Sequence, residues 1–123
     1  MEGTINGWDA IESEVERLTH ASVEPFHFNV LANLRDLLQL CRSRSALPTG
    51  IAKGYWATIR IWWPHFELEV FEDRIEVYRF GEDGTAIWHE DHRPGHEFSD
   101  HFLEELATAL RLNSVLSPKY FGS

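Results

Sequence analysis

The sequence predicts an α+β protein of two layers, in which a four-stranded antiparallel meander carries two N-terminal helices and one C-terminal helix on one face. Apolar residues recur at helical spacing in roughly the first 50 residues, at every second position between residues 55 and 90, and at helical spacing again from residue 99. At 123 residues the chain has the length of one domain, and its 43% hydrophobic residues, among them five Trp and eight Phe, supply a core.

We expect a single domain over residues 1–123, without internal repeats or a long linker. The turn-rich stretch from Ser43 to Gly54 separates a helical part from a strand-rich part. The predicted parts are a helical region (1–50), an antiparallel sheet (55–90), a C-terminal helix (99–112) and a tail (113–123).

Two helices are predicted before the sheet. Asn6 is suited to cap the first, and Pro25 fits the first turn of the second, which should end near Arg42 and Arg44 because basic residues favour a helix C-terminus. The apolar face of the first helix consists of Trp8, Ile11, Val15 and Leu18, and that of the second of Phe28, Leu31, Leu34, Leu38 and Cys41.

Four strands follow, joined by turns short enough for consecutive hairpins at Pro64–His65, Glu72–Asp73 and Gly81–Gly84. The predicted strands are Trp56–Trp63, Phe66–Phe71, Arg74–Phe80 and Thr85–Glu90. Turns of even length place Ile61 opposite Leu68, Ile59 opposite Val70, Val70 opposite Ile75, Leu68 opposite Val77, and Val77 opposite Trp88.

The last helix begins after Ser99, a suitable N-cap, with Phe98 and Leu103 spaced as a hydrophobic staple. Its apolar stripe consists of Phe102, Leu103, Leu106 and Leu110. The helices are therefore expected to cover the sheet face that carries Ile59, Leu68 and Val77.

The opposite face of the predicted sheet mixes large aromatic residues with charges, whereas a plain solvent face would be mostly polar. Glu69 should lie between Arg60 and Glu76, so two carboxylates face each other unless Arg60 or a partner compensates. Exposed aromatics beside charges are typical of protein-binding surfaces. The predicted partner-binding residues are Trp62, Glu67, Glu69, Glu76, Tyr78, Glu82, Asp83 and Ile87. The alternative is that the tail or a second copy of the chain covers this face.

The charge distribution indicates the kind of partner. The net charge is −9, and the segment from Glu67 to Glu105 alone holds thirteen acids against three arginines. An acidic surface repels phosphate backbones and anionic lipids and attracts basic surfaces. We therefore expect no direct nucleic-acid or membrane binding, but a protein partner with a basic surface, such as a protein that itself binds nucleic acid. A homodimer is also compatible with this surface.

No motif of catalytic chemistry is present, so neither enzyme activity nor a cofactor is expected. The sequence lacks G-x-S-x-G, G-x-x-x-x-G-K and G-x-G-x-x-G, and Cys41, the one cysteine, lies on an apolar helix stripe. Four histidines, His89, His92, His96 and His101, lie among acids, but their spacing fits no established metal-ligand pattern. A His-rich metal-binding protein is kept as a further alternative.

The sequence contains no apolar run long enough to span a bilayer and no signal-peptide pattern at its acidic N-terminus. A cytoplasmic location is the simplest expectation.

Three features follow the leading helices along the chain. They are the Leu47–Pro48 connection, the hairpin Arg79-Phe80-Gly81-Glu82-Asp83-Gly84-Thr85 and the leucine-rich closing helix. Over residues 25–112 this layout resembles small uncharacterised bacterial proteins of toxin-antitoxin and mobile-element neighbourhoods. The resemblance transfers no functional residue, but it implies a neutralising or inhibitory role through a partner.

Together these observations predict a small acidic inhibitor that blocks a basic partner surface stoichiometrically, of the antitoxin, immunity or phage-borne anti-defence type, such as an anti-CRISPR. The first alternative is a homodimeric scaffold module, and the second is the metal-binding protein.

Overall fold

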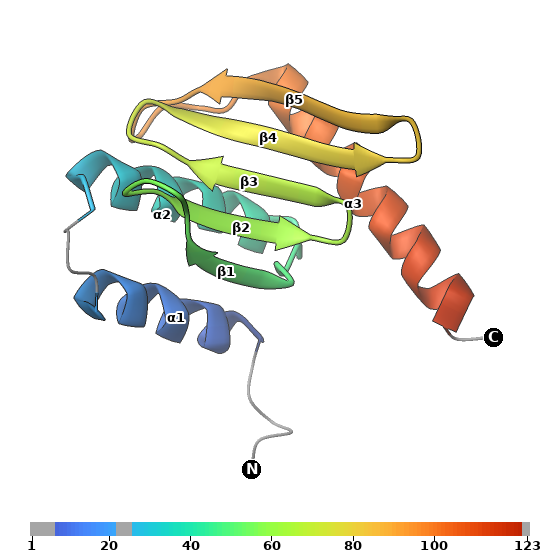
Figure 1. The fold of residues 1–123 in the computed structure, drawn as a ribbon, viewed down its shortest axis with the longest axis horizontal. Coiled ribbons are helices and arrows are strands. Elements are labelled where there is room, and N and C mark those ends of the chain that lie inside the picture. The colour runs from blue at the N-terminus through green and yellow to red at the C-terminus, as the bar shows by residue number, and fades with distance from the viewer. Residues whose placement is uncertain (1–6, 22–25, 122–123) are drawn as a thin grey trace, which may run out of the picture.

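A computed structural model describes residues 7–21 and 26–121 of the chain, with side chains described for residues 7–20 and 26–111. The fold is α+β, with three helices and a five-stranded antiparallel sheet in this part (Figure 1). Its elements are α1 (Gly7–Ala21), α2 (Phe28–Ser43), β1 (Gly50–Lys53), β2 (Ile59–Trp63), β3 (Phe66–Val70), β4 (Arg74–Gly81), β5 (Gly84–Asp91) and α3 (Asp100–Phe121).

The sheet is a meander in which each strand pairs with its neighbour in the sequence, in the order β1-β2-β3-β4-β5. The predicted register is confirmed at every pair. Ile61 faces Leu68 and Leu68 faces Val77. The same register pairs Ile59 with Val70, Val70 with Ile75, and Val77 with Trp88.

The prediction of four strands was wrong, because the segment assigned to the turn-rich connection contains β1. Ile51 of this strand is buried and pairs with Ile61, and Thr49 extends the ladder by donating its backbone N–H to the Trp62 carbonyl at 2.7 Å. A four-residue strand that starts with glycine has little pattern of its own. Its pairing with β2 stabilises it instead.

The start of the second strand was also placed too early. β2 begins at Ile59, whereas Trp56 lies in the loop between β1 and β2 and is 71% exposed. The backbone N–H of Gly54 donates to the Thr58 carbonyl at 2.8 Å and closes this loop, and Lys53 Nζ donates to the Trp56 carbonyl at 3.0 Å. These two hydrogen bonds turn the chain before the strand begins.

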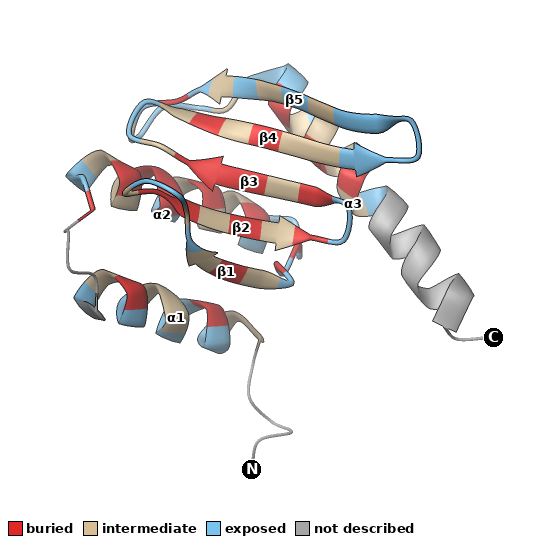
Figure 2. Ribbon diagram, in the orientation of Figure 1, coloured by how far each residue is buried: buried red, intermediate tan, exposed pale blue. Residues whose placement is uncertain are grey.

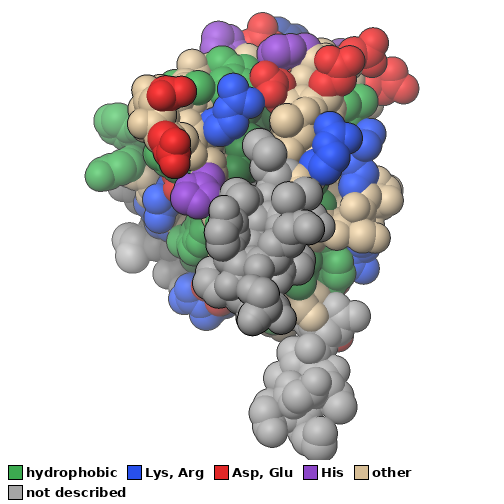
Figure 3. Space-filling view, turned by 90° about the vertical axis from the view of Figure 1, so that its right-hand side faces the viewer, with side chains coloured by type: hydrophobic (Ala, Val, Ile, Leu, Met, Phe, Trp, Pro, Cys, Tyr) green, Lys and Arg blue, Asp and Glu red, His purple; other side chains and the backbone are tan. Residues whose placement is uncertain are grey.

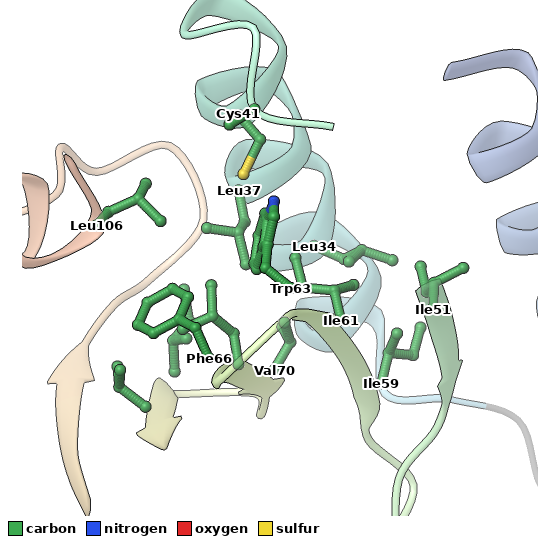
Figure 4. Close-up of a cluster of buried hydrophobic side chains, with 14 of the residues drawn as sticks. Leu34, Leu37, Cys41, Ile51, Ile59, Ile61, Trp63, Phe66, Val70 and Leu106 are labelled. Atoms are coloured by element: carbon green, nitrogen blue, oxygen red, sulfur yellow. The ribbon is translucent and has the colours of Figure 1, made fainter. Parts of the chain in front are cut away.

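The core lies between the sheet and the helices. In Figure 1, α2 runs behind the sheet, α3 begins behind β5, and α1 lies alongside β1 at the edge of the sheet. Buried residues follow the sheet side of α2, alternate along β2 and the first half of β4, and include every residue of β3 except Glu67 (Figure 2). Figure 4 shows the labelled side chains of β1, β2 and β3 converging on α2. The most completely buried include Leu34, Leu37, Ile59, Ile61, Leu68, Val70, Ile75, Val77, Phe102 and Leu106.

The buried side of α2 differs from the predicted apolar face. Phe28 is 77% exposed, whereas the polar Asn33 has no exposed surface. Leu31 and Leu38 are only partly buried. The residues of α2 that are fully buried are Val30, Asn33, Leu34, Leu37 and Cys41. The helix starts with His27 as N-cap, whose Nδ1 accepts from the Asn29 backbone N–H at 3.0 Å. The predicted cap Asn6 and Pro25 lie outside the described residues.

The predicted N-cap of the last helix is confirmed. Ser99 Oγ accepts from the Phe102 backbone N–H at 3.1 Å. Phe98 stacks on Phe102 at 5.0 Å between ring centroids, so Phe102 rather than Leu103 is its ring partner. The helix continues to Phe121, well beyond the predicted end at residue 112, and the segment predicted as a tail is helical up to that residue. Among the described residues no helix has the length and apolar character needed to cross a membrane.

Candidate docking face

The face of the sheet turned away from α2, here called the outer face, carries the predicted partner-binding residues. Figure 1 looks onto it, and no described helix lies in front of the strands. Cross-strand pairing brings Gly50, Trp62, Glu67, Tyr78 and Ile87 into one row that runs from β1 to β5. We call these five residues the aromatic row. The row crosses all five strands and brings Trp62, Tyr78 and Ile87 into one line, with Glu67 between the two aromatic residues.

Gly50 leaves the room that the Trp62 side chain occupies. A Cβ atom added at Gly50 would collide with the six-membered ring of the Trp62 indole. The indole therefore lies over the β1 backbone, and the Arg60 guanidinium lies 5.6 Å from its ring centroid. Trp62 is half-buried in this position, between the β1 backbone and Arg60.

Tyr78 is oriented by a carboxylate of the neighbouring row. Its hydroxyl donates to Glu76 Oε1 at 2.7 Å, and the other carboxylate oxygen of Glu76 accepts from Arg74 Nε at 3.0 Å. Burial, and then the hydrogen bond to Glu76 and the charges of Glu76, Glu69 and Glu67, raise the pKa of Tyr78 above its ordinary value. The phenol is therefore a fixed donor on this face.

A pH dependence follows for Tyr78. A raised pKa in the folded state means that this group stabilises the fold fully below about pH 10, its ordinary pKa, and that the contribution is lost at higher pH. Tyr78→Phe is expected to lower the free energy of unfolding by about 1 kcal/mol at pH 7. The difference from the wild type should shrink above pH 10 in urea titrations. A difference that stays constant up to pH 11.5 would contradict this reading.

Arg60, one of the two groups considered as compensation for Glu69, does not pair with it. Glu69 does lie between Arg60 and Glu76 in the register. However, Arg60 pairs with Glu67, at 3.5 Å between Nη1 and Oε2, whereas Glu69 Oε2 accepts from the Thr58 hydroxyl at 2.5 Å. Glu69 is only 6% exposed. It therefore holds the loop to the sheet and is not available to a partner.

Gly54 makes room for this buried pair. A Cβ atom at Gly54 would lie 2.6 Å from Glu69 Oε2 and would also overlap the Thr58 hydroxyl. Gly54→Ala is therefore expected to lower the free energy of unfolding by about 2 kcal/mol, since it displaces a buried carboxylate from its hydrogen bond. Thermal or urea unfolding measures this loss. Gly81→Ala is the control, because a Cβ atom at Gly81 would have only the Gly84 carbonyl oxygen near it, at 3.8 Å. Gly95→Ala is unsuitable because the φ of +82° at Gly95 strains any other residue. Equal losses at both sites would refute the explanation.

The remaining acidic residues lie at the rim of the outer face. Glu82 and Asp83 form the turn between β4 and β5, are exposed, and take part in no ion pair among the described residues. Ile87, in the aromatic row near this turn, is 64% exposed. Figure 3 views the end of the molecule where this turn lies, and its acidic side chains gather mainly in the upper part of the view.

Sequence reasoning missed two exposed aromatic residues beside this face. Tyr55 is 92% exposed and Trp56 is 71% exposed, both in the loop that Thr58 and Glu69 hold to the sheet. The available signal was the adjacent pair of aromatics between Gly54 and the strand. It was read as the start of a strand because aromatic residues are also frequent in strands.

One histidine of the His-rich segment, His92, has a structural role. His92 is buried, with Nε2 at 3.0 Å from Asp36 Oδ2 and its ring stacked on Phe98 at 4.2 Å. Asp36 also accepts from the Gly95 backbone N–H at 2.9 Å. In the described part of the chain no three His, Cys, Asp or Glu side chains are placed to hold a metal ion. His92 thus fixes the loop before α3 to α2.

Cys41 is buried with no exposed surface, and this burial raises the pKa of its thiol to about 12. Because the thiolate is the reactive form, the side chain is unreactive at neutral pH. The imidazole of His92, which lies beside Asp36, is likewise inaccessible, because its side chain has no exposed surface that a substrate could reach.

No family model, curated protein or solved structure matches this chain. The geometry of the outer face is therefore the basis for assigning a function.

Proposed function

We propose that this protein acts by stoichiometric binding, as an inhibitor of the antitoxin, immunity or anti-defence type that covers a basic surface of a protein partner. The observation that carries the proposal is the aromatic row, which ends in the exposed Ile87 and has no described element of the fold in front of it. A soluble domain rarely presents such a strip without a partner to bury it.

The arrangement has the anatomy of an interface. Trp62, Tyr78 and Ile87 supply an apolar centre, and tryptophan and tyrosine are the residues most often found at binding hot spots. Glu82 and Asp83 supply an acidic rim. A hydrophobic centre inside a polar rim is the usual division of such surfaces.

The three central carboxylates of the outer face, predicted to attract a partner, are engaged by contacts within the protein. Glu67 contacts Arg60, Glu76 contacts Arg74 and Tyr78, and Glu69 is buried against the Thr58 hydroxyl, so all three carboxylates have partners within the protein. The attraction of a basic partner then falls to Glu82, Asp83 and the other exposed acids of the segment 67–105. Such rim charges accelerate association more than they slow dissociation.

The rim charges lead to a kinetic test with the partner that copurifies with the untagged chain. Raising the salt concentration from 50 to 500 mM should lower the association rate constant about tenfold or more, with a small effect on dissociation. Glu82→Lys should lower the association rate at 50 mM salt, whereas Glu16→Lys on α1, the same charge change at another exposed site, should have a smaller effect. A salt-independent association rate would argue against the proposed steering.

A second function, a homodimeric scaffold, is favoured by one observation. β5 is eight residues long and forms the end of the sheet, and no described residue pairs with its outer edge. An unprotected edge of this length can pair with another strand. Light scattering of the pure protein distinguishes the two functions: a monomer supports the inhibitor, and a stable dimer at micromolar concentration supports the scaffold.

A further inference from the structure

A hollow of about 470 Å³ lies on the helix side of the protein, away from the outer face. Its walls come from the connection between α2 and β1, from the end of β2 and from α3. This volume falls in the range of small-molecule sites, roughly 300 to 1,000 Å³. The side chains that matter for its chemistry are Arg44, Ser45, Leu47, Trp63, Leu110 and Arg111.

The two arginines at the hollow carry uncompensated charge. Arg44 and Arg111 are both exposed, and neither forms an ion pair with any described residue. By contrast, Arg17, Arg42 and Arg60 all have a carboxylate partner. Arg35 and Arg93 also lack an ion pair among the described residues, but neither of them lines this hollow, whereas Arg44 and Arg111 both do.

The sequence keeps acids away from this site. There is no Asp or Glu from residue 37 to residue 66 or after Glu105. Every segment that lines the hollow lies within these two acid-free stretches. The residues that line the hollow therefore include two arginines and no acid, an arrangement that attracts an anion.

The largely buried indole of Trp63 forms part of the inner wall. Trp63 is only 6% exposed, and its indole Nε1 has no hydrogen-bond partner in the described structure. Figure 4 shows this nitrogen on the side of Cys41, the end of α2 from which the chain continues to Arg44 and Ser45. The indole thus offers the hollow an apolar surface, while its N–H lies inside the core.

We propose that this hollow binds a small carboxylic acid with an apolar body, such as a medium-chain fatty acid. Arg44 and Arg111 bind the carboxylate, for which the planar guanidinium is well matched. Leu47, Leu110 and the Trp63 indole contact the apolar body. This site is independent of the proposed docking face.

The test uses the full chain and decanoate, with decanol and acetate as probes that lack the charge or the apolar body. Calorimetry should show saturable one-to-one binding of decanoate, and neither of the other probes should bind comparably. In an ¹⁵N–¹H spectrum the indole signal of Trp63, assigned with Trp63→Phe, should shift with the same saturation.

Arg44→Ala and Arg111→Ala are each expected to weaken decanoate binding about tenfold, the loss of one charged hydrogen-bonding partner. Arg93→Ala removes an exposed arginine that also lacks an ion pair among the described residues, and should leave the affinity unchanged. These three side chains are exposed, so the variants should fold. The proposal is overturned by absence of saturable binding, by equal binding of decanol, or by equal effects of all three variants.

Discussion

Replacing Asn33 with aspartate should destabilise this protein by about 3 kcal/mol or more. The Asn33 side-chain amide on α2 lies at 3.0 Å from the Phe71 carbonyl, 3.2 Å from the Glu72 carbonyl and 3.4 Å from the His92 carbonyl. Asn33 has no exposed surface. Asn33→Asp places a buried carboxylate against three carbonyl oxygens and removes their donor, which is far costlier than the loss of one hydrogen bond.

Urea unfolding at several pH values measures this effect. Gln39→Glu is the matched control, because it makes the same amide-to-acid change at an exposed position of the same helix. It is expected to change the free energy of unfolding by less than about 0.5 kcal/mol. The deficit of Asn33→Asp should shrink at acidic pH, where the introduced carboxyl is protonated. Similar stabilities of the two variants at pH 7 would show that Asn33 does not connect α2 to the sheet.

The second large effect concerns partner binding. Ile87→Lys is expected to weaken the complex by about thirtyfold or more, because it removes the exposed apolar contact at the β5 end of the aromatic row and sets a positive charge against a basic partner. Ile87 is 64% exposed, so the fold should lose no more than about 1 kcal/mol, the usual span of strand preferences. Trp62→Ala should also weaken binding, but with a larger loss of stability because Trp62 packs over Gly50.

Phe28→Lys provides the control for Ile87→Lys. Phe28 is 77% exposed at the start of α2, so the same chemical change is made away from the outer face. Surface plasmon resonance with the copurified partner should show unchanged affinity for this variant. If both substitutions weaken binding equally, the partner does not recognise the aromatic row.

The sheet register was predictable from the sequence because period and turn length fix it together. Residues that alternate along each strand must all face the core, and a shift by one residue would expose Ile59, Leu68 and Val77 at once. β1 was not predictable in this way. Gly50–Lys53 has one buried residue, Ile51, and becomes a strand through its partner β2.

The candidate site was predictable only at the level of the backbone. Register alone places Trp62, Glu67, Tyr78 and Ile87 in one row. Which carboxylate meets which partner depends on side-chain conformation and on the loop that covers the sheet. For this reason Glu69, expected on the surface, is buried beneath the loop with Thr58 as its donor.

Asn33 of α2 is a second residue whose contacts could not be predicted from the sequence pattern. A polar residue between apolar ones on α2 reads as an exposed position, and the sequence pattern predicted a face centred on other residues. Its burial is explained by three carbonyl groups from the loops after β3 and β5, which need a donor. These loops come together only in the folded chain, so local sequence carries no signal for them.

The central claim, that the outer face of the sheet binds a protein partner, is tested most directly by photo-crosslinking in cells. A benzophenone amino acid is introduced at position 87 in one chain and at position 28 in another. We expect one abundant covalent adduct from position 87 and none from position 28. The mass of this adduct should differ from twice the 14.3 kDa of the chain, which distinguishes a partner from a second copy. An adduct only at position 28, or none at position 87, would contradict the claim.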